Sequence, residues 1–283
     1  MVGDAHRAPE TAAGRLGRRL LTGWAVLGFV YLFIPIAVIV GYSFNDPAGK
    51  FNIIWRRFTF DNWAHAFERG PLTEAMVRSL QIAGIATIAA TVLGGLVALA
   101  LARYRFRGGA LIEILLVLPL TTPEIVLGAS LLSLFIDLDQ QRGFWTIVIA
   151  HVLFCTSFVA LTIKARIRGF DWTLEDAAMD LGAPPWRTFS RVTLPLIMPG
   201  ILAAALLSFA LSIDDFIITF FNAGTTETFP LRIFGASRNE ISPQINVLAT
   251  VVLLASVALL LAGVAARARV EGRPVVVLTD TDG

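Results

Sequence analysis

Six long apolar stretches follow one another along the 283-residue chain and constrain its fold more than any other feature. A helix that crosses the roughly 30 Å hydrocarbon core of a bilayer needs about 20 apolar residues. Leu, Val, Ile, Ala and Gly fill these stretches without the alternation of barrel strands, which favours helices. The sequence therefore predicts an all-α membrane protein with six transmembrane helices, near residues 21–42, 76–102, 110–136, 144–167, 194–221 and 245–266.

Composition excludes several other classes of protein. The chain is 56% hydrophobic and 16% charged, whereas a soluble domain carries roughly 25% charged residues. Its net charge of +2 does not indicate a nucleic-acid partner. Cys155 is the single cysteine and the three histidines lack ligand spacing, so we expect neither a disulfide nor a metal site. Cys155 and His151 are expected to pack inside the helix bundle.

The basic residues indicate the topology. About two thirds of the 23 Lys and Arg residues fall in segments that would share the N-terminal side of the membrane. We therefore expect both termini to be cytoplasmic, with a tail over residues 1–20, a transmembrane domain over 21–268 and a second tail over 269–283. The first apolar stretch is longer than that of a cleaved signal peptide and no A-x-A site follows it, so we expect it to be retained.

The loop over residues 170–194 carries the most specific signals. Thr173 can cap the start of a short helix with Asp176 at its third position, which is the spacing of a capping box. Gly182 suits the left-handed position past the helix end, and the two prolines that follow suit the first turn of a second helix. We therefore predict a helix–turn–helix at the cytoplasmic face of the membrane.

The first helix of this loop has two physical interpretations. Its acidic first turn, with Glu175 and Asp176, and the small residues Ala177 and Ala178 would let a basic partner surface approach closely. A capped amphipathic helix that lies on the membrane without a partner fits the same residues. Physical chemistry alone leaves both interpretations open.

The same loop resembles the EAA motif of ABC importer permeases, which reads E-A-A-x-x-x-G and is followed by a hydrophobic residue and Leu-Pro. Here Asp176-Ala177-Ala178 precedes Gly182, and Val192-Thr193-Leu194-Pro195 follows. The resemblance implies a type I ABC importer permease (MetI-like) fold, in which this loop is the coupling helix that docks on an ATP-binding subunit. Asp176 replaces the family's Glu and is one methylene shorter, so the resemblance implies an altered salt bridge to that subunit or one that Glu175 shares. The residues implied in ATPase coupling are Glu175, Asp176, Ala177, Ala178 and Gly182.

A wider resemblance covers nearly the whole chain. Stretches such as Tyr104–Gly108, Leu211–Phe216 and Ser242–Asn246 are similar to the second permease subunit of spermidine/putrescine importers. The resemblance implies a permease of the bacterial cytoplasmic (inner) membrane that forms half of a polyamine pathway. Its implied partners are an ATP-binding subunit dimer, a second permease subunit, an extracytoplasmic substrate-binding protein and the lipid bilayer.

The chain itself is not expected to be an enzyme. Neither Lys50 nor Lys164 completes the G-x-x-x-x-G-K-[ST] phosphate-binding loop, and no G-x-S-x-G or H-E-x-x-H occurs. We therefore expect no cofactor on this chain, with ATP and Mg²⁺ bound and used by a separate ATP-binding subunit.

Three acidic residues lie at membrane depth, where a charge is costly and usually functional. Glu124 follows Pro123, and Pro119 and Pro123 should distort their helix. Asp214 and Asp215 are consecutive, so about 100° of helical rotation separates them and they cannot point the same way. Spaced carboxylates attract the ammonium groups of polyamines, as aromatic faces do.

The family resemblance implies that the substrate pathway is lined by Trp63, Glu124, Ser212, Asp214 and Asp215. The residues by themselves leave structural alternatives open. Asp214 and Asp215 could form an ion pair with Arg232 or Arg238, or could be a helix-end feature near the outer interface. Glu124 could hydrogen-bond to a partner permease, and Trp63 could belong to an interfacial belt or a loop core.

Two other functions fit parts of the pattern. The first keeps the ABC permease architecture with another cargo, namely ferric iron, thiamine, an opine or a sugar. The second is a proton-coupled secondary transporter with Glu124 as its relay. The coupling loop and the lack of inverted repeats argue against the second.

Overall fold

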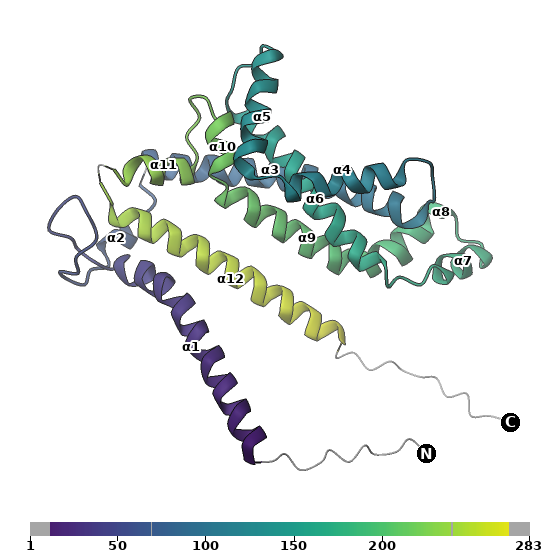
Figure 1. The fold of residues 1–283 in the computed structure, drawn as a ribbon, viewed down its shortest axis with the longest axis horizontal. Coiled ribbons are helices and arrows are strands. Elements are labelled where there is room, and N and C mark those ends of the chain that lie inside the picture. Colours follow the sequence, from purple (N-terminus) through teal and green to yellow (C-terminus); the bar gives the residue numbers. More distant parts are fainter. Residues whose placement is uncertain (1–11, 69, 239, 272–283) are drawn as a thin grey trace. The chain divides into compact units, whose positions relative to one another are not determined.

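The computed structural model describes residues 12–68, 70–238 and 240–271. These residues form helices joined by loops, with two isolated backbone bridges and no strand, which confirms the all-α prediction (Figure 1). The predicted tails fall largely on residues 1–11 and 272–283, outside the described residues. The helices are α1 (Ala12–Tyr42), α2 (Asp61–Ala64), α3 (Pro71–Arg103), α4 (Gly109–Thr121), α5 (Glu124–Asp137), α6 (Phe144–Ile167), α7 (Thr173–Asp180), α8 (Pro185–Thr188), the π-helical turn η1 (Phe189–Thr193), α9 (Leu194–Asp214), α10 (Ile217–Asn222), α11 (Phe229–Ala236) and α12 (Pro243–Glu271).

The predicted count of six spans is approximate. Among the described residues, four helical stretches are long and apolar enough to cross a bilayer, and the bent pair α4–α5 makes a fifth if it is counted as one span. The sixth predicted span falls on α12, whose apolar part, Pro243–Ala258, is shorter. The four long stretches are Gly17–Tyr42, Pro71–Arg103, Phe144–Ile167 and Pro185–Asp214, the last of which runs through α8, η1 and α9.

The distortion predicted for the third span is confirmed at Pro123, whereas Pro119 lies inside α4. α4 and α5 meet at an angle of 109°, with Pro123 as the residue before α5. Pro123 has no N–H to continue the helical ladder, and proline disfavours a helical conformation of the residue before it. That residue, Thr122, is extended at ψ 131°, and its hydroxyl donates to the Leu118 carbonyl at 2.7 Å. The break therefore follows from the local sequence.

The fifth span differs from the prediction, which ran one helix on to residue 221. α9 ends at Asp214 and α10 begins at Ile217, with Asp215 in an extended conformation between them. No proline or glycine marks this position in the sequence. The interruption depends instead on the side-chain contacts of the candidate functional site.

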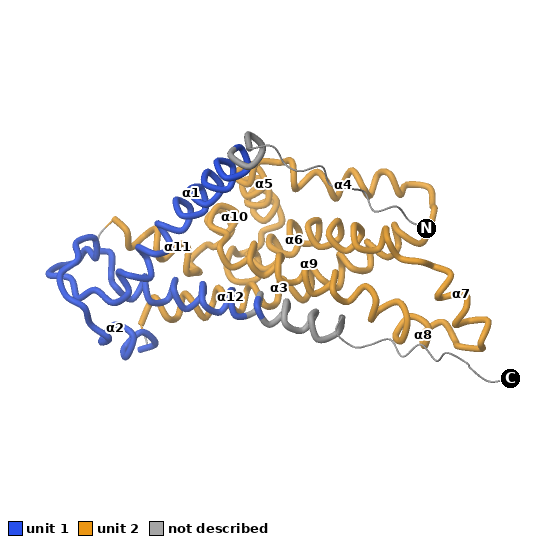
Figure 2. Tube along the Cα trace, turned by 90° about the horizontal axis from the view of Figure 1, so that it is seen from below, with its two compact units in different colours: residues 1–68, 239–283 blue, residues 69–238 orange. Residues whose placement is uncertain are grey.

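The chain divides into two compact units (Figure 2). The first holds residues 1–68 and 239–283, and its described part contains α1, α2, α12 and the loop from Tyr42 to Phe60. Two buried asparagines order that loop: the Asn45 amide donates to Asn52 Oδ1 at 2.7 Å and to the Ile54 carbonyl at 2.8 Å.

The second unit, residues 69–238, is a bundle in which α3, α6 and α9 pack against one another and α10 packs on α5. Small residues let these helices approach closely. A Cβ on Gly94 of α3 would lie 2.8 Å from the Val159 side chain of α6, and one on Gly128 of α5 would lie 2.9 Å from Phe221 of α10. Close packing of small residues is the usual means of association between helices in a membrane.

Candidate functional site

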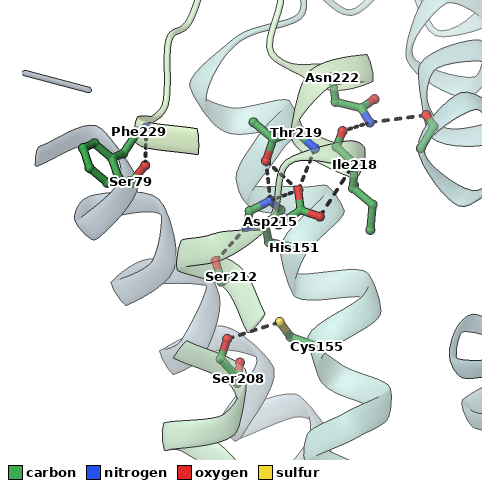
Figure 3. Close-up of polar contacts among 11 residues, drawn as sticks. Ser79, His151, Cys155, Ser208, Ser212, Asp215, Ile218, Thr219, Asn222 and Phe229 are labelled. Carbon is green, nitrogen blue, oxygen red and sulfur yellow. Dashed lines mark hydrogen bonds and ion pairs between the residues drawn. The ribbon is translucent and has the colours of Figure 1, made fainter. Parts of the chain in front are cut away.

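Asp215 is an anchor inside the second unit, and its side chain is only 5% exposed (Figure 3). Its Oδ2 accepts hydrogen bonds from the backbone N–H and the hydroxyl of Thr219, both at 2.7 Å. Its Oδ1 accepts a longer bond of 3.4 Å from the Ile218 N–H. The first turn of a helix has unsatisfied N–H groups, so this carboxylate caps α10 and stabilises the break after α9.

His151 of α6 completes the cluster. Its Nδ1 lies 2.6 Å from Ser212 Oγ, and its Nε2 lies 2.9 Å from Thr219 Oγ1 and 3.3 Å from Asp215 Oδ2. The Thr219 hydroxyl gives its hydrogen to Asp215, so its oxygen is an acceptor for a hydrogen on His151 Nε2. In a neutral ring Nδ1 then accepts from the Ser212 hydroxyl, which lies 2.6 Å away. The imidazole thus joins α6, α9 and α10, as Figure 3 shows.

These contacts revise the sequence interpretation of two residues. The burial predicted for His151 is confirmed at 1% exposure, but its polar role was missed. The ion pair considered between the two aspartates and Arg232 or Arg238 does not form. Arg232 pairs with Glu227 at 3.1 Å, and Arg238 lies over the Phe234 ring at 5.2 Å. The available signal was the imidazole itself, since a buried polar group in an apolar helix needs partners.

Asp214 has the opposite environment. It is exposed, and no ion-pair partner occurs for it among the described residues. The residues on its C-terminal side form an aromatic cluster, in which the Phe216 ring lies 4.8 Å from Phe234 and 5.8 Å from Phe220. Of these, Phe220 and Phe234 are largely exposed. The two adjacent carboxylates therefore have different environments, as predicted, but the cause is the break after Asp214 and not rotation along a continuous helix.

Glu124 lies at the bend between α4 and α5. It is the first residue of α5, it is exposed, and its acidic side chain is favoured at a helix N-terminus by the helix dipole. Trp63 belongs to the first unit, where its indole N–H donates to Ser43 Oγ at 3.1 Å and its ring stacks on Phe44 at 5.4 Å. Trp63 is therefore part of a loop core in this unit.

The loop between α6 and α9 confirms some predictions and corrects others. Gly182 follows α7 with φ +85°, the left-handed conformation predicted for it, and the proline of α8 stands in its first turn. The predicted cap is wrong: Thr173 is the first residue of α7, and Asp171 accepts its N–H at 3.0 Å and its hydroxyl at 2.8 Å. These bonds stabilise the ionised carboxylate and lower the pKa of Asp171. The second helix is also not separate, because α8 continues through η1 into α9.

The two acidic residues of α7 face different ways. Glu175 was expected at the partner surface, but it is only 2% exposed. Its carboxylate forms an ion pair with Arg103 at the end of α3 and accepts a hydrogen bond from the Thr193 hydroxyl. Asp176 and Ala177 are exposed, and Ala178 is half-buried. The sequence missed Arg103 and Thr193, which lie 72 and 18 residues from Glu175. The exposed side of α7, with Asp176, Ala177 and Met179, is therefore the part that a partner could reach.

Within residues 12–68, 70–238 and 240–271, no three His, Cys, Asp or Glu side chains group as metal ligands would. The buried acceptors of Asp215 are already used by Thr219, Ile218 and His151.

Known proteins resemble this chain over most of its length. The spermidine/putrescine transport system permease protein PotC of Escherichia coli K12 is 38% identical over 248 residues, 87% of this chain and 93% of the relative. PotC of Haemophilus influenzae is 38% identical over 232 residues, 82% of this chain and 90% of the relative. The putrescine transport system permease protein PotI of E. coli K12 is 39% identical over 236 residues, 81% and 83% of the two chains.

Solved structures support the fold. A chain of a bacterial ABC transporter involved in the import of the acidic polysaccharide alginate matches with a TM-score of 0.66 and 14% identity, over 90% of this chain and 98% of that one. A chain of an amino acid ABC transporter matches with a TM-score of 0.56 and 16% identity, over 76% and 100%. The predicted type I ABC importer permease fold is thereby confirmed. Residues 71–273 match the family described as binding-protein-dependent transport system inner membrane component, and the chain belongs to that family.

Proposed function

We propose that this chain is a permease subunit of an ATP-driven polyamine importer, in which it forms half of the translocation pathway. The observation that carries the proposal is the 38–39% identity, over most of both chains, to permeases named for spermidine and putrescine transport. The exposed Asp214, two residues before Phe216 and its cluster with Phe220 and Phe234, supports the proposal, because carboxylates and aromatic faces both attract ammonium groups.

The second half of the proposal concerns the partners. The chain works with a second permease subunit, a dimer of ATP-binding subunits that hold ATP and Mg²⁺, and an extracytoplasmic substrate-binding protein. It lies in the bacterial cytoplasmic membrane with both termini in the cytoplasm. The exposed side of α7, with Asp176, Ala177 and Met179, docks on an ATP-binding subunit, and Gly182 gives α7 the tight turn that ends it.

Within the pathway the acidic residues have different tasks. Asp214 and Glu124 are exposed and attract the cation. Asp215, through Thr219, and Ser212, through His151, hold the α9–α10 break that presents Asp214.

The test is uptake of radiolabelled spermidine and putrescine by cells that lack this chain, with and without the gene restored. We expect restoration to bring back uptake that vanadate blocks and an uncoupler does not. Uptake abolished by the uncoupler would indicate a proton-coupled carrier. A complex that assembles with an ATP-binding subunit but carries no polyamine would overturn the cargo, and iron, thiamine, opines and sugars would be assayed next.

A further inference from the structure

Glu175 is a buried carboxylate on a helix that is otherwise largely exposed. Its residue exposure is 2%, whereas Leu174 is 45% exposed and Met179 is 36% exposed on the same helix. An ionised group leaves water at a cost of several kcal/mol unless it is paired and hydrogen-bonded. Glu175 therefore lies inside because specific partners hold it there.

Those partners come from two different helices. Arg103, the last residue of α3, donates to Oε2, and the hydroxyl of Thr193, the last residue of η1, donates to Oε1. The Arg103 guanidinium also lies 5.5 Å from the ring of Trp172, the residue just before α7. One carboxylate thus ties α7 to the end of α3 and to the point where η1 passes into α9.

The element at this junction is itself unusual. η1 is a π-helical turn, and such turns inside longer helices occur mostly at functional positions and at kinks. α3 and α9 are two of the three long helices that form the bundle of the second unit. A displacement of α7 therefore either moves both helices through Glu175 or breaks a buried ion pair.

We infer that Glu175 is a positioning residue that transmits movement of α7 to α3 and α9, and that it makes no contact with the ATP-binding subunit. The inference rests on the proposed function, because it takes the exposed side of α7 as the surface on which that subunit docks. Asp176 then serves docking and Glu175 serves transmission, although the two are adjacent in the sequence.

The test uses the whole importer, reconstituted in liposomes with its ATP-binding subunits and the binding protein loaded with spermidine. Glu175→Gln keeps the size of the side chain and removes the charge that Arg103 neutralises. We expect the complex to assemble, and the spermidine transported per ATP hydrolysed to fall about fivefold, a change typical of mutations that alter the coupling between sites. A role in folding alone would lower yield, transport and hydrolysis together and leave that ratio unchanged.

Three further variants make the result specific. Glu74→Gln on α3 breaks an exposed ion pair with Arg78, and we expect the ratio to stay at the wild-type value. Arg103→Lys keeps the charge and should retain most of the coupling. The exchange of Glu175→Arg with Arg103→Glu should recover part of the lost ratio.

If Glu175→Gln fails to assemble, Arg103→Gln tests the same ion pair from its exposed side, where the side chain is 41% accessible.

Docking is measured separately with a cysteine at an exposed position of α7. Met179→Cys gives an accessible thiol, because Met179 is exposed. The crosslink is specific to this thiol, because the single native cysteine, Cys155, is buried. A crosslink from this thiol to the ATP-binding subunit, together with a lowered ratio in Glu175→Gln, supports the inference. A crosslink with an unchanged ratio overturns the inference and leaves the proposed function standing. Absence of any crosslink overturns the docking assignment and the inference with it.

Discussion

Two pairs of consecutive carboxylates, Glu175-Asp176 on α7 and Asp214-Asp215 at the end of α9, share one arrangement. In each pair one side chain is buried and fully partnered while its neighbour is exposed. On α7 the rotation of about 100° between consecutive helical residues separates the two side chains. After α9 the extended conformation of Asp215 separates it from Asp214. In both places one of two adjacent charges can anchor an element while the other meets a ligand or partner. A doublet of acidic residues therefore does not by itself indicate a doubly charged binding site.

The two anchors differ in what they hold. Glu175 is bound by a permanent cation, Arg103, from a helix 72 residues away, so it links separate elements. Asp215 is bound chiefly by the hydroxyl and N–H of Thr219, four residues further on, with the imidazole of His151 beside it. The first anchor is thus suited to transmitting movement, and the second is suited to fixing a local break in a helix.

The largest expected effect is on stability, from Asp215→Ala. The Thr219 N–H, the Thr219 hydroxyl and the His151 ring would lose an acceptor in a buried place, which should lower the free energy of unfolding by about 2–4 kcal/mol. Cys155 provides the measurement, because it is buried and lies one turn from His151 on the same helix, so its labelling by a maleimide dye on heating reports unfolding.

The exposed member of the pair is the matched control for stability. Asp214→Ala should leave the Cys155 labelling temperature nearly unchanged, since surface substitutions usually stay within about 0.5 kcal/mol. Equal destabilisation by the two variants would contradict the division into an anchor and a free carboxylate.

The next effect concerns transport. Asp214→Asn removes the charge that attracts the ammonium groups while keeping the size of the side chain, and we expect initial spermidine uptake to fall about tenfold, or roughly 1.4 kcal/mol. Asp137→Asn, at the exposed end of α5, is the control and should transport normally. A normal rate for Asp214→Asn, measured in the same proteoliposomes, would remove Asp214 from the pathway.

A smaller effect is expected at the turn after α7. Gly182 has φ +85°, and a Cβ there would meet nothing within 4 Å, so the cost of a side chain comes from the backbone conformation alone. Gly182→Ala should therefore destabilise the turn by about 1 kcal/mol, whereas Gly182→Asn should cost less, because Asn tolerates the left-handed region. Limited proteolysis between α7 and α8 measures the difference. Equal cleavage of both variants would show that the turn tolerates any small side chain.

Local sequence predicted local features well. Pro123 predicted the bend after α4, Gly182 predicted the end of α7, and the long apolar stretches predicted the helices. The contacts that decide which acidic residues are buried and which are exposed were not predictable in the same way. Arg103 lies 72 residues from Glu175, and His151 lies 61 residues from Ser212, so tertiary packing decides which partner each residue meets.

The break between α9 and α10 illustrates the same limit. Residues 211–222 contain no proline or glycine and are largely apolar apart from Asp214 and Asp215, which predicts that the helix continues through them. Asp215 nevertheless caps a new helix at that point, because α6 brings His151 beside it. A span end can therefore be set by a buried polar cluster that leaves no local signal except the acidic residue itself.

The smallest effect is expected at Asp171, an exposed carboxylate that caps α7 without joining two helices. Hydrogen bonds from Thr173 lower the pKa of Asp171 in the folded protein. The contribution of this carboxylate to the stability of α7 is therefore complete above its unfolded pKa of about 4, and it is lost as the pH falls through the lower folded pKa. The Thr173 amide should thus lose protection from hydrogen exchange in wild type only below about pH 4. Asp171→Ala should lack that protection at every pH, while transport per ATP hydrolysed stays as in wild type. A loss of coupling in Asp171→Ala as large as in Glu175→Gln would mean that any loosening of α7 uncouples the importer, and the buried ion pair would then have no special part in transmission.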